Sequence, residues 1–197
     1  MITTKIKSFF IRGAEPDDVP LILAFIKELA AFEALSHEVV ATEALLEETL
    51  FGERRTAEVL IGEYQGIPAA FALFFHNFST FLGRPGIYLE DLFVKPSFRG
   101  KGLGKCMLTY LGHLARKRGC GRLEWWVLDW NAPAIDFYKS MEAVPMDEWT
   151  VFRITGESLD KLGRDFKRTE AGEQRTEARR QKPGQKPGSL EIDYSLL

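Results

Sequence analysis

The sequence is poor in the residues that hold structural metals or build disulfide frameworks, with two cysteines and three histidines in 197 residues. Cys106 and Cys120 lack the spacing of metal ligands, and two cysteines are too few for a framework of disulfides. We therefore expect no metal site and a reducing, cytoplasmic environment. Cys106 falls one residue before the apolar stripe of a predicted helix, so we expect it to pack; action as a nucleophile is the alternative.

Long hydrophobic runs and a strong charge of either sign are also missing. No apolar run approaches the roughly 20 residues of a membrane span, and the first 15 residues hold too short an apolar segment for a signal peptide. The formal net charge of −2 gives no reason to expect nucleic acid or a membrane as a partner. With 45% hydrophobic and 12% aromatic residues, the chain can nevertheless bury one good core.

Apolar periodicity predicts a single α+β, or mixed α/β, domain. The strands on either side of the main helix, which begins near 103, are expected to be parallel. A Gln-Gly pair at 65–66 predicts a hairpin turn. The predicted strands are 6–12, 57–64, 67–75, 88–94, 122–130 and 149–154, with 77–86 as a loop or strand end, and helices are predicted over 16–33 and 43–50, from 103, from 131, and as a closing turn over 157–162.

The composition changes after residue 162. From Gly163 hydrophobic residues become scarce, and the triplet Lys-Pro-Gly occurs at 182–184 and again at 186–188. Such a segment buries too little apolar surface to offset its ordering entropy. We therefore expect one domain over 1–162 and a charged, flexible or partly helical tail over 163–197.

One stretch, 88–118, combines a short apolar strand, a break and a glycine-rich helix start. The strand carries an acidic pair, Glu90 and Asp91, and the sequence Lys-Pro-Ser at 95–97 ends it. Glycines at 100, 102 and 104 then let the backbone approach a ligand at a helix N-terminus. The free N–H groups and the helix dipole favour an anion there.

The details of this loop distinguish between families of phosphate binders. Both a Rossmann fingerprint and a Walker A loop need a glycine where Lys105 stands. The sequence RGKGLG at 99–104, after a strand ending in Leu-Phe-Val, meets the pattern Arg/Gln-x-x-Gly-x-Gly/Ala. It resembles the acetyl-CoA pyrophosphate loop of the GNAT superfamily of N-acetyltransferases. A strand–helix turn that binds no ligand is the alternative.

Three blocks carry this resemblance over most of the chain: IKELAAFE at 26–33, YLEDLFVKPSFRGKGLG at 88–104, and VLDWNAPAIDFYKS at 127–140. Together they resemble most the diamine (spermidine/spermine) acetyltransferase branch, and within it the thialysine type. The resemblance implies the GNAT-like acyl-CoA N-acyltransferase fold, a central mixed sheet of about six to seven strands flanked by helices. It also implies a homodimer.

The resemblance further implies where acetyl-CoA and the amine bind. The backbone of residues Leu92, Phe93 and Val94 would pair with the pantetheine arm, and Tyr138 would lie beside the sulfur. The other implied cofactor contacts are Arg99, Gly100, Lys101, Gly102, Leu103, Gly104, Lys105, Asn131, Ala132, Pro133 and Ala134. The implied amine pocket is lined by Phe32, Glu33, Glu90, Asp91, Glu124, Trp125 and Trp126.

The chemistry of amine acetylation explains these residue types. A primary amine has a pKa near 10 and arrives as a cation, so an acid must attract it and accept its proton. Glu90 is the candidate base, because burying a carboxylate in an apolar strand destabilises the fold and is therefore expected mainly where the carboxylate has a function. A backbone N–H near Phe93 could stabilise the oxyanion, and Tyr138 could protonate the thiolate. Neither a covalent enzyme intermediate nor a metal is required.

Each of these residues also has a purely structural interpretation. Glu90 could pair with an arginine, and Tyr138 could pack with its hydroxyl at the surface. Tryptophans more often pack in a hydrophobic core than form a cage around a cation. Strand alternation would also place Trp125 and Trp126 on opposite faces of the sheet.

Two departures from the branch pattern bear on the substrate. The polyamine enzymes carry an acid and a tryptophan where this chain has Ser79, Thr80 and Phe81, which removes a carboxylate for a long polycation. Glu142 and Ala143 replace the usual glycine-alanine after Tyr138, where a left-handed cap favours glycine. We therefore expect acetylation of a thialysine- or lysine-like amino acid or a short diamine. Acetylation of a protein amine and a non-catalytic CoA-binding regulatory module are the alternatives.

Overall fold

The computed structural model describes residues 1–166, which fall into two units that join at Met141 and Glu142. The first unit, Met1–Met141, is the body. Its strands are β1 (Ile2–Thr3), β2 (Phe9–Gly13), β3 (Glu58–Tyr64), β4 (Ile67–Ser79), β5 (Arg84–Val94) and β6 (Leu123–Trp125). Its helices are η1 (Pro16–Asp18), α1 (Val19–Phe32), η2 (Ser36–Glu38), α2 (Glu43–Phe51), η3 (Pro96–Phe98), α3 (Leu103–Lys117) and α4 (Ala132–Ser140). The described part of the second unit contains α5 (Gly156–Asp165).

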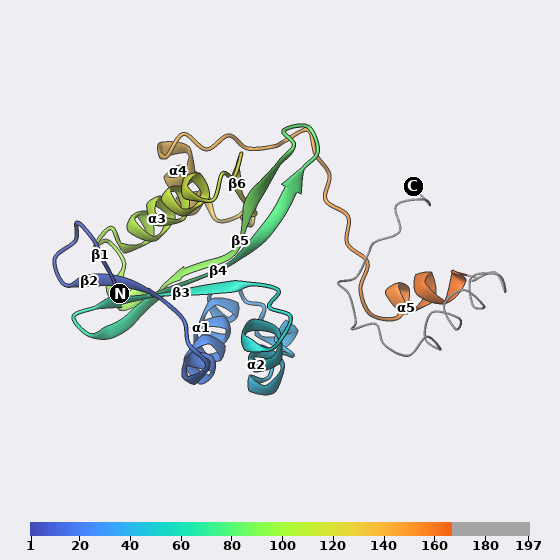
Figure 1. Cartoon of the computed structure of the whole chain (residues 1–197), viewed down its shortest axis with the longest axis horizontal. Helices are drawn as coiled ribbons and strands as arrows, with labels where there is room; N and C mark the ends of the chain where they lie inside the picture. Colours follow the sequence, from blue (N-terminus) through green and yellow to red (C-terminus); the bar gives the residue numbers. More distant parts are fainter. Residues whose placement is uncertain (167–197) are drawn as a thin grey trace, which may run out of the picture. The chain divides into compact units, whose positions relative to one another are not determined.

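The six strands form one sheet in chain order. Neighbours are antiparallel from β1 to β5, and β6 runs parallel to β5 on its outer edge (Figure 1). This mixed sheet confirms the predicted fold class and the predicted parallel pair. Gln65 and Gly66 join β3 to β4 with φ angles of 53° and 77°, the geometry that a tight hairpin favours.

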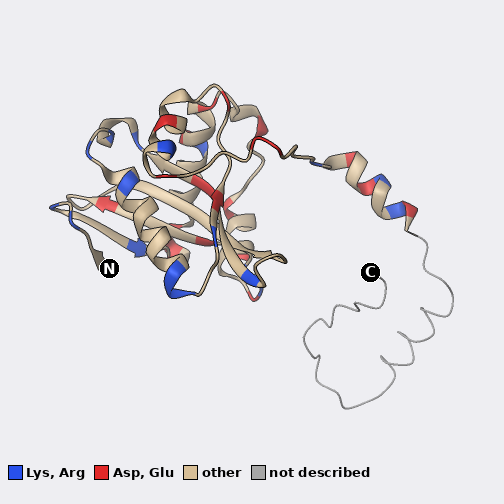
Figure 2. Ribbon diagram, turned by 90° about the horizontal axis from the view of Figure 1, so that it is seen from above, with Lys and Arg blue, Asp and Glu red and all other residues tan. Residues whose placement is uncertain are grey.

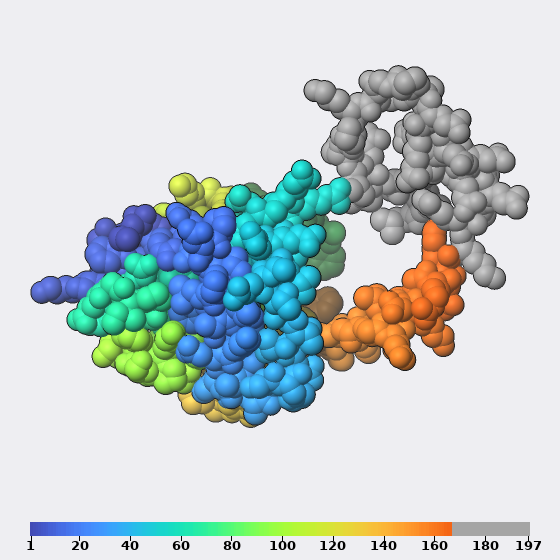
Figure 3. All heavy atoms as spheres, turned by 90° about the horizontal axis from the view of Figure 1, so that it is seen from below, coloured from blue at the N-terminus to red at the C-terminus, as the bar shows by residue number. Residues whose placement is uncertain are grey.

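Helices cover both faces of the sheet in the body. α1 and α2 lie on one face, and α3 and α4 lie on the other (Figure 1). The atoms of α1 and α2 fill much of the first face in the space-filling view from that side (Figure 3). A sheet covered on both faces needs an apolar core on each, and the buried residues do form two clusters.

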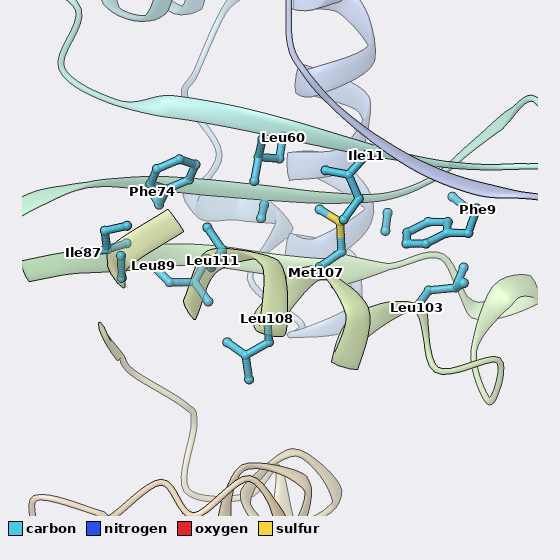
Figure 4. Packing of buried hydrophobic residues seen from close by; sticks show 14 residues of the cluster. Phe9, Ile11, Leu60, Phe74, Ile87, Leu89, Leu103, Met107, Leu108 and Leu111 are labelled. Carbon is cyan, nitrogen blue, oxygen red and sulfur yellow. The ribbon is translucent and has the colours of Figure 1, made fainter. Parts of the chain in front are cut away.

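The core on the α3 face confirms the predicted apolar stripe of the main helix. Leu103, Met107 and Leu111 are at most 1% exposed. They lie between α3 and the strands, opposite residues such as Phe74 and Leu89 (Figure 4). Burial of one such side chain contributes about 2 kcal/mol, so this stripe fixes the helix that follows the glycine loop.

The core on the α1 face is built around aromatic rings. Phe25 of α1 stacks on Phe71 of β4 with a centroid distance of 5.0 Å. The same ring meets Phe93 of β5 edge-on at 6.4 Å. Phe93 therefore anchors the carboxyl end of β5, directly before the glycine loop.

Several predicted strand limits are wrong. The predicted strand 122–130 ends already at Trp125, because the chain turns after it, with Asn131 N donating to Leu128 O. The residues 77–86 extend β4 and β5 except for a short connection, and β1 was not predicted at all. Two-residue strands carry no periodic signal, so β1 depends on its pairing with β2.

The predicted strand 149–154 is also wrong. These residues are not in a strand, and Trp149 and Phe152 are 69% and 89% exposed. Alternating apolar residues form a strand only beside another strand, and the described chain offers this segment none. The closing turn predicted at 157–162 is confirmed as part of α5. The predicted domain limit at residue 162 falls inside α5, and most of the predicted tail lies outside the described residues.

Charged side chains of both signs are interspersed along the strands and helices of the body (Figure 2). This pattern agrees with the small net charge. Among the described helices, none combines the length and the apolar character that a membrane span needs.

Candidate active site

The parallel strands β5 and β6 pair over only three residues each, Ile87 to Leu89 with Leu123 to Trp125. Beyond Leu89, β5 continues to Val94 with β4 on one side and no strand on the other within residues 1–166. The outer edge of residues 91–94 therefore faces no strand and can pair with an extended ligand, although Val94 O already accepts from Arg99 Nε. The two strands no longer pair beyond Leu89 and Trp125.

The glycine loop lies directly after this open strand. Gly100 and Gly102 have φ angles of 75° and 77°, a left-handed conformation that costs other residues about 1–2 kcal/mol. Gly102 is the N-cap of α3, so the first N–H groups of the helix point out of the loop without intrahelical partners. The predicted glycine turn and helix start are thus confirmed, and such a helix N-terminus favours an anion; binding of the pyrophosphate there stays a prediction.

A β-bulge places the acidic pair on one face of the sheet. Leu73 of β4 pairs with Asp91 while Phe74 pairs with Leu89, so Glu90 has no partner across the strand. Leu89 packs in the core on the α3 face, whereas Phe93 packs on the α1 face. Strand alternation with one extra residue therefore turns the side chains of Glu90 and Asp91 both toward the α1 face.

Three carboxylates gather on that face. Burial raises the pKa of Asp91 to about 6, and the charges of Glu90 and Glu33 add to the rise. Burial also raises the pKa of Glu33, the C-cap residue of α1. The negative end of the α1 dipole lies at the same place. The cluster therefore favours a bound cation, which would offset both the repulsion between the acids and their partial loss of water.

Glu90 itself is exposed. None of the ion pairs among the described residues involves it, so the structure lends no support to the alternative that it serves an arginine. An exposed carboxylate beside two half-buried ones can reach a substrate.

An aromatic and cationic stack borders the carboxylates. The guanidinium of Arg99 lies 4.4 Å from the ring centroid of Phe32, and the ring centroid of Trp130 lies 6.0 Å from that of Phe32. Arg99 Nε also donates to Val94 O at 3.0 Å. Arg99 and Phe32 thus connect the glycine loop to the end of α1, which carries Glu33. Trp130 was not among the predicted site residues.

Tyr138 lies on the opposite face, at the point where β5 and β6 separate. Its ring is 4.9 Å from that of Trp125, the last residue of β6. Burial raises the pKa of the Tyr138 hydroxyl, which therefore stays protonated at neutral pH. α4 is held in place at its start by Asn131, whose side chain accepts from Ala134 N at 3.3 Å. Asn131, Ala132, Pro133 and Ala134 thus form the first turn of the helix that carries Tyr138.

Trp125 and Trp126 lie on opposite faces, as alternation predicted. Trp125 packs against the core on the α3 face, whereas Trp126 meets Tyr88 edge-on at 5.7 Å. Tyr88 in turn lies 5.1 Å from Phe75. These three rings pave the α1 face of the sheet next to Glu90. Tyr88 and Phe75 were not predicted site residues, although alternation from Leu89 indicates their face.

Glu124 also lies on this face, but its carboxylate has partners. Glu124 Oε2 accepts from Asn77 Nδ2 at 2.6 Å and lies 2.7 Å from Arg122 Nε. Asn77 and Arg122 were not identified from the sequence, because their meeting depends on the register between β4, β5 and β6. Of the predicted amine-pocket residues, the structure thus brings Glu33, Glu90 and Asp91 together and places Glu124 in a separate polar cluster.

Comparison with known proteins agrees with this architecture. The sequence model of the acetyltransferase (GNAT) family matches residues 24–142. The thialysine N-epsilon-acetyltransferase of Bos taurus is 37% identical over 163 residues, which cover 77% of this chain and 95% of the relative. The L-ornithine N5-acetyltransferase NATA1 of Arabidopsis thaliana is 45% identical over 96 residues, which cover 49% of this chain and 42% of the relative.

Solved structures share the fold. An integron cassette protein from the mobile metagenome of V. cholerae superposes with a TM-score of 0.69 and 26% identity, covering 80% of this chain and 99% of that one. An aminoglycoside acetyltransferase from a soil metagenome gives a TM-score of 0.64 at 16% identity, covering 75% and 96% of the two chains. GNAT acetyltransferases use acetyl-CoA as co-substrate. The family match over more than half of the sequence and the coverage of the bovine relative show that this chain is an acetyltransferase of the GNAT family.

Proposed function

We propose that the chain transfers the acetyl group of acetyl-CoA to a primary amine of a small molecule by direct attack in a ternary complex. A thialysine- or lysine-like amino acid or a short diamine is the proposed substrate. The observation that carries this proposal is the edge of β5 that β6 leaves unpaired beyond Leu89, with the glycine loop at its end and carboxylates beside it. The thialysine and ornithine acetyltransferases among the relatives support the substrate class.

The open strand and the glycine loop fit acetyl-CoA. Residues 92–94 would pair with the amide groups of pantetheine, and the amides of 100–105 would hold the pyrophosphate. Gly104 lies close to the strand, since a Cβ there would be 3.6 Å from Val94. Asn131 and the first turn of α4 would border the thioester end, where Tyr138 lies.

On the carboxylate side, the acids would divide two tasks. Asp91 and Glu33, both half-buried, would hold the ammonium group. Glu90 would accept the proton that the ammonium must lose before its nitrogen can attack. Its exposed position at the bulge lets it pass that proton to water afterwards.

Bond changes follow from this arrangement. The amine nitrogen forms a bond to the thioester carbon, and the developing oxyanion is stabilised by a backbone N–H near Phe93. The carbon–sulfur bond then breaks, and the thiolate takes a proton from Tyr138. Glu90 and Tyr138 lie on opposite faces of the sheet, so they can act on opposite sides of a group held at the unpaired edge of β5.

We further propose a homodimer in the cytoplasm. Val144, Trp149, Phe152 and Ile154 are each more than half exposed, which supports contact with another chain. Cys106 and Cys120 are free thiols, as is usual in a reducing compartment.

The test is turnover of acetyl-CoA, followed by release of free thiol, with thialysine, lysine, putrescine, spermidine, spermine and a histone-like peptide. Glu90→Gln and Tyr138→Phe are each expected to lower kcat at least tenfold, with acetyl-CoA binding unchanged. Asp136→Asn, an exposed acid on α4, is the matched control. Turnover of the peptide alone would replace the proposal with protein acetylation. Tight acetyl-CoA binding without any turnover would replace it with a regulatory module.

A further inference from the structure

The polar cluster of Asn77, Arg122 and Glu124 lies on the same sheet face as Glu90. Tyr88 pairs with Glu124 across the parallel strands, and Asn77 pairs with Gly86. Alternation along β5 places Tyr88 and Glu90 on one face, with Glu124 beside Tyr88. The cluster therefore lies beside the carboxylates of Glu33, Glu90 and Asp91, about two residues toward the N-terminal end of β5.

Gly86 lets this cluster approach the backbone. A Cβ at Gly86 would collide with the amide oxygen of Asn77 and with the side chain of Arg122. The two side chains thus occupy the space that any other residue at position 86 would fill. Both side chains therefore lie against the backbone of β5 at Gly86.

The cluster also has unused hydrogen-bonding capacity. Asn77 Oδ1 is buried and has no hydrogen-bond partner among the described residues. Asn77 and Arg122 both contact Oε2 of Glu124, which leaves Oε1 as a further acceptor. Arg122 Nε lies 2.7 Å from Glu124 Oε2 but is buried without a hydrogen-bond partner among the described residues. The two terminal nitrogens of Arg122 carry the donors that a carboxylate takes. Buried polar atoms are nearly always paired, so a group from outside would complete the cluster.

We propose that this cluster binds the zwitterionic head of an ω-amino acid, with Arg122 on the α-carboxylate and Glu124 on the α-ammonium. The proposal rests on the proposed function and specifies its substrate as an amino acid rather than a diamine. Arg122 and Glu124 together carry no net charge, and the zwitterionic head group carries none either. The second ammonium of a diamine would instead meet the positive charge of Arg122.

The separation of the two sites fits the length of such a substrate. Two residues along a strand and one strand across place the Cα atoms of Glu90 and Glu124 about 8 Å apart. The five bonds from the terminal nitrogen of lysine or thialysine to its Cα span roughly 6 Å. The rings of Tyr88, Phe75 and Trp126 pave the surface between the sites, and methylene groups or a thioether sulfur pack well on such rings.

The test compares kcat/KM for lysine, for cadaverine, which is lysine without its carboxylate, and for 6-aminohexanoate, which is lysine without its α-amino group. Wild type is expected to prefer lysine to each analogue at least tenfold. Arg122→Gln should lower kcat/KM for lysine at least tenfold and that for cadaverine less than threefold. Glu124→Gln should affect lysine more than 6-aminohexanoate. Arg122→Lys keeps the positive charge but loses the planar guanidinium that can donate two hydrogen bonds to a carboxylate. Its kcat/KM for lysine should lie between those of wild type and Arg122→Gln.

Arg116→Gln, an exposed arginine of α3, is the matched control and should change neither substrate. Equal use of lysine and cadaverine by wild type, or an equal loss for both in Arg122→Gln, would overturn the proposal while leaving acetyl transfer intact. Calorimetry of lysine and cadaverine with the CoA-loaded protein separates the two hypotheses further. Lysine binding that depends on Arg122, without turnover of any amine, would support the head-group site and overturn the proposed transfer.

Discussion

Among single residues of the site, Asp91 pays the clearest electrostatic cost for its position. Its pKa rises from 3.8 to about 6 through burial and the neighbouring charges of Glu90 and Glu33. Between these pH values the folded chain holds a proton that the unfolded chain releases. The contribution of Asp91 to stability is therefore most favourable below pH 4, becomes less favourable as the pH rises to about 6, and stays so above it.

Asp91→Asn removes the ionised form and should raise the free energy of unfolding more at pH 8 than at pH 4.5. Since Asp91 is partly screened by water, we expect the difference between the two pH values to be about 1–2 kcal/mol. Urea denaturation of both proteins at both pH values measures it. Asp136→Asn provides the control and should show no such pH dependence. A gain that is equal at the two pH values would show that burial of Asp91 has no electrostatic cost.

At the scale of elements, a substitution in the glycine loop separates an effect on acetyl-CoA binding from an effect on stability. A Cβ at Gly100 meets no atom within 4 Å, but its φ of 75° strains any other residue. Gly100→Ala should therefore cost about 1–2 kcal/mol of stability and raise KM for acetyl-CoA at least tenfold. Steady-state kinetics and urea denaturation measure the two effects.

Gly112 provides the matched control on α3. It too has open space around its Cα, but it lies inside the helix with ordinary backbone angles. Gly112→Ala should raise stability by about 0.5–1 kcal/mol and leave KM unchanged. A similar response of the two positions would contradict the role given to the loop.

The end of α4 keeps the left-handed cap despite the absence of glycine. Glu142, the residue after the C-cap, has a φ of 64°. Glu142→Gly should relieve this strain and raise the free energy of unfolding by about 0.5–1 kcal/mol. Lys139→Gly, within the same helix, should lower it by about 1 kcal/mol. Loss of stability in Glu142→Gly would show that the carboxylate has a local role that outweighs the strain.

The elements that the sequence predicts well are those with local causes. The stripe of Leu103, Met107 and Leu111 and the glycines before it define α3 and its loop without reference to the rest of the chain. The early end of β6 and the bulge at Glu90 depend on which strands pair and in which register. The cluster of Asn77, Arg122 and Glu124 likewise joins two strands far apart in sequence, so no local pattern indicates it.

At the scale of the whole molecule, the predicted strand at 149–154 shows most clearly that a local pattern does not reveal which segments pair. Its alternating apolar residues are exposed in the single chain. We expect light scattering to give a mass near twice 22.4 kDa, and Phe152→Asp to shift that mass toward the monomer. Phe81→Asp, at a position that is 94% exposed in the β4–β5 connection, should leave the dimer intact. A monomeric wild type would contradict the proposed assembly.

The bulge at Glu90 also predicts the effect of a deletion in the gene. Without that residue, Leu89 and Leu92 would stand two positions apart on the α3 face, with Asp91 and Phe93 alternating on the other, so the strand would be regular and its core unchanged. In genetic terms, the proposed base corresponds to a single codon without which the strand would keep its alternation. An in-frame loss of this triplet should leave a folded chain that still binds CoA, as calorimetry can measure, but no longer turns over amines. Removal of three nucleotides would then separate catalysis from CoA binding.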